Sequence, residues 1–113
     1  MKVRIEDHVK FDEARMAKIA LATTSRCQLD LYCIAPGQAQ RPHKHADQDK
    51  IYYVLEGLGR FSLAGNDLRL ATGEALVAPA GVEHGVANDG TDPLLVLVVV
   101  TPPPPHAQET KKP

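Results

Sequence analysis

The stretch that decides the fold class is Gly73-Glu-Ala-Leu-Val-Ala-Pro79-Ala-Gly81-Val-Glu-His84-Gly-Val-Ala-Asn88. Within it, the segment from Pro79 to Gly81 is a turn signal that separates two short runs rich in apolar residues. Similar glycine-containing turn signals recur at short, regular intervals on both sides of this stretch, and the segments between them are often β-branched. Many short strands separated by regularly spaced turns predict an all-β sandwich or closed barrel.

The chain has 113 residues, which is the length of one domain. We predict that residues 25–101 form the barrel. Residues 1–24 are predicted to form an N-terminal arm, with a short edge strand at residues 3–5 and either a helical turn or an extended arm at residues 12–20. Residues 102–113 begin with four consecutive prolines, which cannot donate to a sheet ladder, and are predicted to be a disordered tail.

The composition excludes several classes of protein. The 13 basic and 14 acidic residues give a formal net charge of −1, and no basic stripe that would bind nucleic acid stands out. Residues 1–6 do not resemble a signal peptide, because charged residues interrupt every apolar run. The longest apolar stretch, from Leu94 to Val100, is too short for a bilayer, which needs roughly 20 residues. We therefore predict a soluble, cytoplasmic protein that binds neither nucleic acid nor membranes.

Cys27 and Cys33 lie in a segment that alternates like a strand, with Leu29 and Leu31 on the same face as both. A strand of that length separates the two by roughly 20 Å, whereas a disulfide needs Cα atoms within about 7 Å. The two cysteines are therefore predicted to be small, buried, free side chains.

The histidines are the first residues that indicate chemistry. His43 and His45 are two positions apart, and in a strand such residues point to the same face, so both imidazoles can reach one metal ion. His84 follows the Pro79 turn at the start of a predicted strand. Each histidine alone is more typical of a solvated or buried side chain than of a ligand.

Together these residues complete two longer patterns, and with them the sequence resembles the cupin superfamily. The second pattern, G-x5-P-x-G-x2-H-x3-N, is filled at every fixed position. The first, G-x5-H-x-H-x3-4-E-x6-G, is filled everywhere except at the acidic position, and the two are separated by the short spacing common in small single-domain microbial cupins. The resemblance implies a double-stranded β-helix, or jelly-roll, barrel in which the three histidines bind one metal ion. The residues that carry it are Gly37, His43, His45, Gly57, Gly73, Pro79, Gly81, His84 and Asn88.

Lys50 occupies the position where the cupin pattern places an acidic ligand. In one interpretation the three histidines bind the metal without a further protein ligand. Burial and the cation then lower the pKa of Lys50, which acts as a base or holds an anionic substrate. In a second, a bulge turns Asp49 or Gln48 inward to replace the missing ligand. In a third, Lys50 abolishes metal binding, and the pocket holds a small molecule without metal.

The resemblance implies a metal-dependent enzyme, an oxygenase or isomerase, that acts on a small organic molecule. Tyr52 shares the face of Lys50 if this segment is a strand, so either residue would orient the substrate or move a proton, unless Tyr52 is only a core aromatic. The alternative is a non-catalytic binding or storage module. Three imidazoles suit Fe, Mn, Ni, Cu or Zn, and the metal is left open.

The apolar segment from Leu94 to Val100 does not alternate with polar residues, so both faces of this strand must be buried. One face can serve the core of the barrel. The other needs cover, from the N-terminal arm or from a second subunit. Because cupins commonly dimerise through such sheets, the resemblance implies a homodimer.

Overall fold

The computed structural model describes residues 1–104, and this part of the chain is built almost entirely of strands. A short 3-10 helix, η1 (Ile5–His8), lies in the N-terminal segment. The strands that follow are, in chain order, β1 (Ala17–Thr23), β2 (Gln28–Ile34), β3 (Ala39–His43), β4 (Asp49–Glu56), β5 (Leu58–Leu63), β6 (Asn66–Ala71), β7 (Ala75–Ala78), β8 (His84–Ala87) and β9 (Leu94–Thr101).

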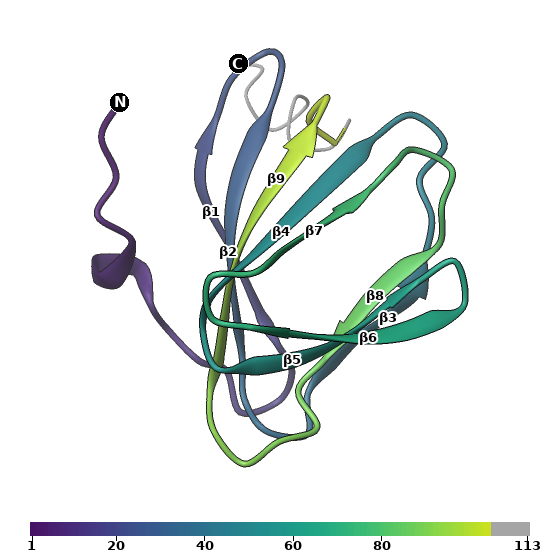
Figure 1. Cartoon of the computed structure of the whole chain (residues 1–113). Helices are drawn as coiled ribbons and strands as arrows, with labels where there is room; N and C mark the ends of the chain where they lie inside the picture. The colour runs from purple at the N-terminus through teal and green to yellow at the C-terminus, as the bar shows by residue number, and fades with distance from the viewer. Residues whose placement is uncertain (105–113) are drawn as a thin grey trace.

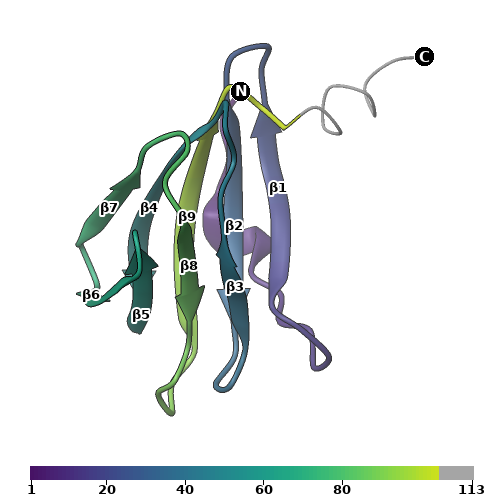
Figure 2. The same ribbon diagram turned by 90° about the vertical axis from the view of Figure 1, so that its right-hand side faces the viewer.

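The strands form two antiparallel sheets that face each other (Figure 1). One sheet has the strand order β1-β2-β9-β4-β7, and the other has the order β3-β8-β5-β6. Figure 2 looks onto the smaller sheet and shows β8 and β3 in front of β9 and β2. The chain repeatedly crosses between the sheets, as it does from β4 to β5. The all-β jelly-roll barrel predicted from the sequence is confirmed.

The space between the sheets is filled by the inward-facing side chains of most strands. Alternation along β4 turns Tyr52 and Val54 inward, and both are completely buried. The Tyr52 ring meets the ring of Phe61 on β5 edge to face, with centroids 5.2 Å apart. Burying each large side chain of this kind stabilises the fold by roughly 1.5–3 kcal/mol. This packing holds the two sheets at a fixed distance, on which the geometry of the site depends.

The N-terminal segment differs from the prediction in its details. Residues 3–5 form no strand, and Ile5 instead begins η1. Residues 12–20 form no helix, and Ala17–Thr23 is the edge strand β1. Although residues 12–20 include good helix formers, pairing with β2 overrides that local preference. The pairing places Ile19 opposite Leu31 and leaves the Ile19 side chain half-buried.

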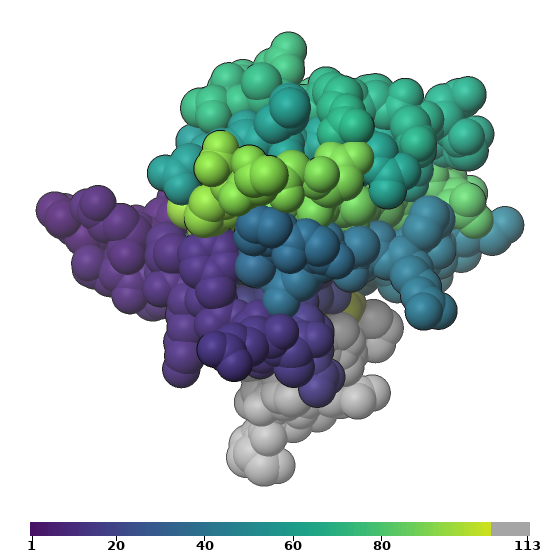
Figure 3. Space-filling view, turned by 90° about the horizontal axis from the view of Figure 1, so that it is seen from below, coloured from purple at the N-terminus to yellow at the C-terminus, as the bar shows by residue number. Residues whose placement is uncertain are grey.

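The outer face of β9 is partly covered. Alternate residues of β9 are buried in the core, and the intervening residues on the outer face are half-buried. The first residues of the chain lie beside this face, where Met1 and Val3 border a hollow together with Leu29 and Val99. Figure 3 shows the N-terminal residues as a projection on one side of the molecule. Farther along the same sheet, Tyr53 and Val77 remain 41% and 55% exposed.

Two residues of the cupin patterns, Gly57 and Asn88, stabilise the barrel and do not belong to the histidine group. Gly57 forms the corner between β4 and β5 with a φ of 96°, and a Cβ there would lie 2.5 Å from the carbonyl oxygen of Pro93, so only glycine fits. Asn88, 1% exposed, donates hydrogen bonds of 2.8 Å to the carbonyl oxygens of Ile34 and Asp92. It thereby ties the end of β8 to β2 and to the loop before β9.

Both cysteines are free, as predicted, with Cys33 buried in β2 and Cys27 half-buried just before that strand. Among residues 1–104, no helix has the length and apolar character required to cross a lipid bilayer. Of the predicted tail, Pro103 is buried and Pro104 half-buried, and the rest lies outside the described residues.

Candidate metal centre and adjoining pocket

Two neighbouring strands of the smaller sheet bring His43 and His84 together. His43 ends β3 and His84 begins β8, and the antiparallel register places the two directly opposite each other. Pro42 precedes His43 without breaking the sheet, because β3 is an edge strand and a missing N–H is tolerated there. His45 lies in the loop after β3, and its carbonyl oxygen accepts a 2.8 Å hydrogen bond from the Gly81 N–H. The turn before β8 therefore positions the His45 segment.

The three imidazoles offer one nitrogen each to a common point. These ligand atoms lie within 4.8 Å of one another, and the His43 ring centroid is 4.5 Å from that of His84 and 4.9 Å from that of His45. His43 Nδ1 lies 2.9 Å from the Arg41 carbonyl oxygen, and His84 Nδ1 lies 3.0 Å from that of Val82. Because a carbonyl only accepts, both Nδ1 atoms must carry the hydrogen, which leaves each Nε2 free to bind a metal.

The protonation state of the histidines favours ligation. Burial is the largest cause that lowers the pKa of His84, to about 4, and the positive charge of Lys50 lowers it further, while the Val82 carbonyl opposes the shift. Burial followed by the same lysine lowers the pKa of His45, and burial also lowers that of His43. All three imidazoles are therefore neutral near pH 7, the form that binds metals.

The His84 Nε2 atom carries the strongest sign of a missing partner. His84 is only 1% exposed, and its Nε2 is buried without a hydrogen-bond partner among the described residues. Leaving such an atom unpaired costs about 1–3 kcal/mol. A transition metal ion held by three imidazoles would satisfy it, and the donor set suits Zn, Fe, Mn, Ni or Cu. The residues present therefore fit a metal centre.

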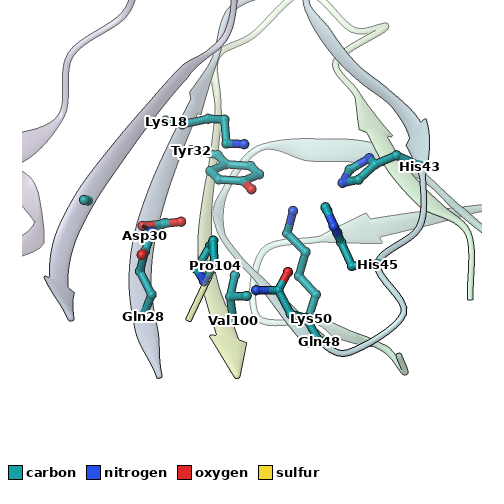
Figure 4. A pocket seen from close by; sticks show the side chains of 11 residues that line it. Lys18, Gln28, Asp30, Tyr32, His43, His45, Gln48, Lys50, Val100 and Pro104 are labelled. Atoms are coloured by element: carbon teal, nitrogen blue, oxygen red, sulfur yellow. Dashed lines mark hydrogen bonds between the residues drawn. The ribbon is translucent and has the colours of Figure 1, made fainter. Parts of the chain in front are cut away.

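A pocket of about 340 Å³ opens beside the histidines, and both His43 and His45 line it. The opposite wall comes from the larger sheet (Figure 4). Figure 4 shows the Lys50 amine pointing into the space between the ring of Tyr32 and the two histidines. The lining residues are Lys18, Ala20, Gln28, Asp30, Tyr32, His43, His45, Gln48, Lys50, Val100 and Pro104.

Lys50 faces the pocket, as the first and the third interpretations both expect, and is only 5% exposed. Its Nζ lies 3.5 Å from Gln40 Oε1 and over the rings of Tyr32 and Tyr52, at 5.1 and 5.4 Å from their centroids. Burial lowers its pKa to about 8, and the charge of Lys18 adds to this effect, while Asp30 opposes it. Lys50 thus releases its proton close to neutral pH and is mainly cationic at pH 7.

Of the two residues considered as replacement ligands, Asp49 is used elsewhere and Gln48 lines the pocket. Asp49 is exposed, and its Oδ1 accepts a 2.8 Å hydrogen bond from the Ala80 N–H, so it is not part of the histidine group. Gln48 is buried and lines the pocket, and its amide nitrogen donates a 3.1 Å hydrogen bond to the Pro102 carbonyl oxygen. No bulge turns the Asp49 carboxylate toward the histidines.

Tyr52 shares the inward face of Lys50, as predicted, but it is completely buried and is not part of the pocket wall. Its ring lies 6.1 Å from the ring of His84, and its hydroxyl is buried without a hydrogen-bond partner among residues 1–104. Burial and the neighbouring Tyr32 raise the pKa of its phenol far above the usual range. These features fit a core aromatic better than a group that moves a proton.

Reasoning from the sequence missed the wall that the first two strands contribute. Gln28, Asp30 and Tyr32 of β2, together with Lys18 of β1, line the pocket. The signal was present in β2, where polar residues alternate with apolar ones. The usual assumption that the apolar face points inward hides it, because here the polar face points into the barrel mouth.

Comparison with known proteins agrees with this architecture. The model of the cupin domain family (Cupin_2) matches residues 30–100. The solved structure of TT1209 from Thermus thermophilus is 40% identical, with a TM-score of 0.87 over 92% of this chain and 98% of that chain. KdgF from Halomonas sp. is 26% identical, with a TM-score of 0.83 over 95% of this chain and 97% of that one.

Curated relatives match over shorter stretches. The oxalate-binding protein of Thermotoga maritima is 33% identical over 61 residues, which are 54% of this chain and 50% of that protein. The chain spans about half the length of the curated relatives it matches.

Proposed function

Because this chain belongs to the cupin domain family, we propose that it is a metal-dependent enzyme that acts on a small organic molecule. His43, His45 and His84 hold one divalent transition metal ion. The observation that carries the proposal is the convergence of their ligand atoms within 4.8 Å, with the Nε2 of His84 buried and unpartnered among the described residues. Three protein ligands leave coordination positions open to a substrate in the adjoining pocket.

Among the reactions open to such a centre, an isomerase-type proton transfer is favoured. A bound cation would act as a Lewis acid on a substrate oxygen. Lys50 supplies the other requirement, since it lines the same pocket and its pKa of about 8 suits a group that exchanges protons near neutral pH. An oxygenase reaction would in addition require a redox-active metal such as Fe(II).

A non-catalytic binding module is the second candidate. Lys50 in place of an acidic ligand favours it, because a cation in this position holds an anion as readily as it moves a proton. The similarity to a protein named for oxalate binding points in the same direction. Turnover separates this candidate from the first.

The first experiment is elemental analysis of the full chain purified without a chelator or a histidine tag. We expect close to one equivalent of a transition metal. Less than about a tenth of an equivalent, with no uptake on reconstitution, would refute the metal centre. The matched control is His8→Ala, which removes an exposed histidine outside the site and should leave the metal content unchanged.

The second experiment tests proton transfer. The metal-loaded protein is incubated in D₂O with a panel of 2-hydroxy aldehydes and 2-keto acids, and exchange at carbon is followed by NMR. Exchange that depends on the metal and is lost in Lys50→Gln supports the isomerase-type reaction. Ligand binding without exchange or turnover would instead favour the binding module.

We also propose that the protein is a homodimer through the outer face of the larger sheet. Tyr53 and Val77 leave apolar surface exposed there, and apolar surface of this kind marks interaction sites. Light scattering should show a dimer that Tyr53→Lys weakens; a monodisperse monomer at all concentrations would contradict it. The location in the cytoplasm remains a prediction.

A further inference from the structure

The wall of the pocket opposite the histidines contains buried polar groups that metal binding does not use. Lys50, Gln28 and Asp30 are each at most 7% exposed, yet all three line the pocket. Buried polar groups usually have partners within the protein. What Lys50 and Gln28 lack defines what a ligand has to supply.

The Lys50 amine has no anion in direct contact, although the Asp30 carboxylate on the same wall favours its charged form. Its hydrogen bond to Gln40 Oε1 is long, at 3.5 Å, and its remaining close neighbours are the faces of two tyrosine rings. No carboxylate among residues 1–104 forms an ion pair with it. Lys18 lines the same pocket at its more exposed side and adds a second positive charge. A buried cation in this setting is satisfied best by a carboxylate of a ligand.

Gln28 lacks a donor. Its Nε2 donates a 2.7 Å hydrogen bond to Asp30 Oδ1. Because a carboxylate only accepts, this bond fixes the orientation of the amide and directs Oε1 away from Asp30. Gln28 Oε1 is buried and has no hydrogen-bond partner among the described residues. An O–H group of a ligand would satisfy it.

Gln28 and Lys50, the two residues with unsatisfied polar groups, line the same pocket. Figure 4 shows Gln28 and Asp30 on one side, His43 and His45 on the other, and the Lys50 amine between them. A ligand that fills the pocket therefore meets an acceptor, then a cation, then the metal centre. The volume of about 340 Å³ lies at the small end of the range for such sites, about 300–1,000 Å³.

We propose that this pocket recognises a small hydroxy acid. Lys50 binds its carboxylate, Lys18 strengthens the attraction from the mouth, and Gln28 Oε1 accepts a hydrogen bond from one of its hydroxyls. The assignment rests on the proposed function only for the role of the metal; toward a ligand carboxylate Lys50 binds as an ammonium and does not act as the base. Lys50 and Gln28 would contact the ligand directly and not through the metal, so their contributions can be tested with and without metal.

The experiment compares three six-carbon probes by calorimetry on the full chain. Gluconate has a carboxylate and hydroxyls, hexanoate has only the carboxylate, and sorbitol has only hydroxyls. We expect gluconate to bind at least about tenfold more tightly than either of the others, because each of them leaves one buried group unpaired. Equal binding of gluconate and hexanoate, or of gluconate and sorbitol, would overturn the proposal.

Variants assign the contacts. Lys50→Gln should weaken gluconate at least about tenfold and hexanoate similarly, while Gln28→Met should weaken gluconate alone. Lys2→Gln, which removes a charge from an exposed position outside the pocket, is the control and should change neither. Gluconate binding unchanged in Lys50→Gln would refute the inference.

Repeating the titrations on chelator-treated protein separates the two proposals. Selective gluconate binding in a protein that takes up no metal would uphold the hydroxy-acid pocket and refute the metal centre. A protein that binds metal but does not distinguish the three probes would do the reverse.

Discussion

The two sheets contribute opposite chemistry to one pocket. The smaller sheet and the loop after it supply three neutral imidazoles, whereas the larger sheet supplies Lys50 and Lys18. The histidine wall, formed by His43, His45 and His84, fills the cupin pattern completely. The lysine wall, which contains Lys50 and Lys18, departs from that pattern at the acidic position, which Lys50 occupies. The difference separates two tasks, because one wall can hold a metal while the other decides which ligand is admitted.

Removing the buried histidine should have the largest effect, because it takes one of the three ligands from the histidine wall. His84→Ala deletes a ligand whose Nε2 is buried, and two imidazoles cannot hold the ion at the same affinity. We expect a loss of at least about 100-fold in metal affinity, measured by competition with a chelator. Full metal content in this variant would mean that the ion lies elsewhere.

Lys50→Glu converts the lysine wall to the usual cupin pattern. A carboxylate in this position adds an oxygen ligand and replaces a positive charge near the ion by a negative one. We expect metal affinity to rise by at least about tenfold, measured by the same competition. Lys50→Gln, which matches glutamate in shape without its charge, should give a smaller increase. Unchanged affinity in Lys50→Glu would show that position 50 does not reach the metal.

Gly85→Ala moves the histidine wall without touching a ligand. A Cβ at Gly85 would lie 2.9 Å from the Gln40 carbonyl oxygen and from the Pro42 nitrogen, both backbone atoms of β3. The two strands have to separate, which shifts His43 relative to His84 and destabilises the fold by about 1–3 kcal/mol. Metal affinity should fall by about tenfold in a protein that remains folded by circular dichroism. Equal affinity would show that the strand spacing does not limit ligation.

The sequence predicted the histidine wall well and the lysine wall poorly, for a physical reason. The residues of the first wall lie within two short motifs, where turns and strand alternation fix their direction locally. Alternation suggested that His43 and His45 act together, and the resemblance to the cupin pattern added His84 to them. The direction of Lys50 was left open by the sequence, and the structure places it on the same buried face of β4 as Tyr52.

The residues of the second wall depend on contacts that no local pattern reveals. Lys18 faces the pocket only because β1 pairs with β2, and residues 12–20 alone resemble a helical segment. On β2 the apolar Leu31 and Cys33 alternate with the inward-facing residues and lie outside the main core cluster, yet both are completely buried. The hydrophobic pattern therefore identified the strand correctly but concealed which of its faces lines the pocket.

The smallest effect is the cost of keeping Lys50 in the barrel. Its pKa is lowered from 10.5 to about 8, so below pH 8 both the folded and the unfolded chain carry the proton, and the folded chain bears the full penalty. Between pH 8 and 10.5 the folded chain releases the proton before the unfolded one, and its stability rises with pH.

The variant Lys50→Met removes this penalty. We expect it to raise the free energy of unfolding of the metal-free protein by about 1–3 kcal/mol at pH 7. The gain is reduced by the cation–π stabilisation that the two tyrosine rings give to the ammonium, which the variant loses. Urea unfolding should show that this advantage shrinks from pH 7 to pH 10, and Lys10→Met, at an exposed position, is the matched control. An advantage that is independent of pH would mean that packing, and not the buried charge, distinguishes the two side chains.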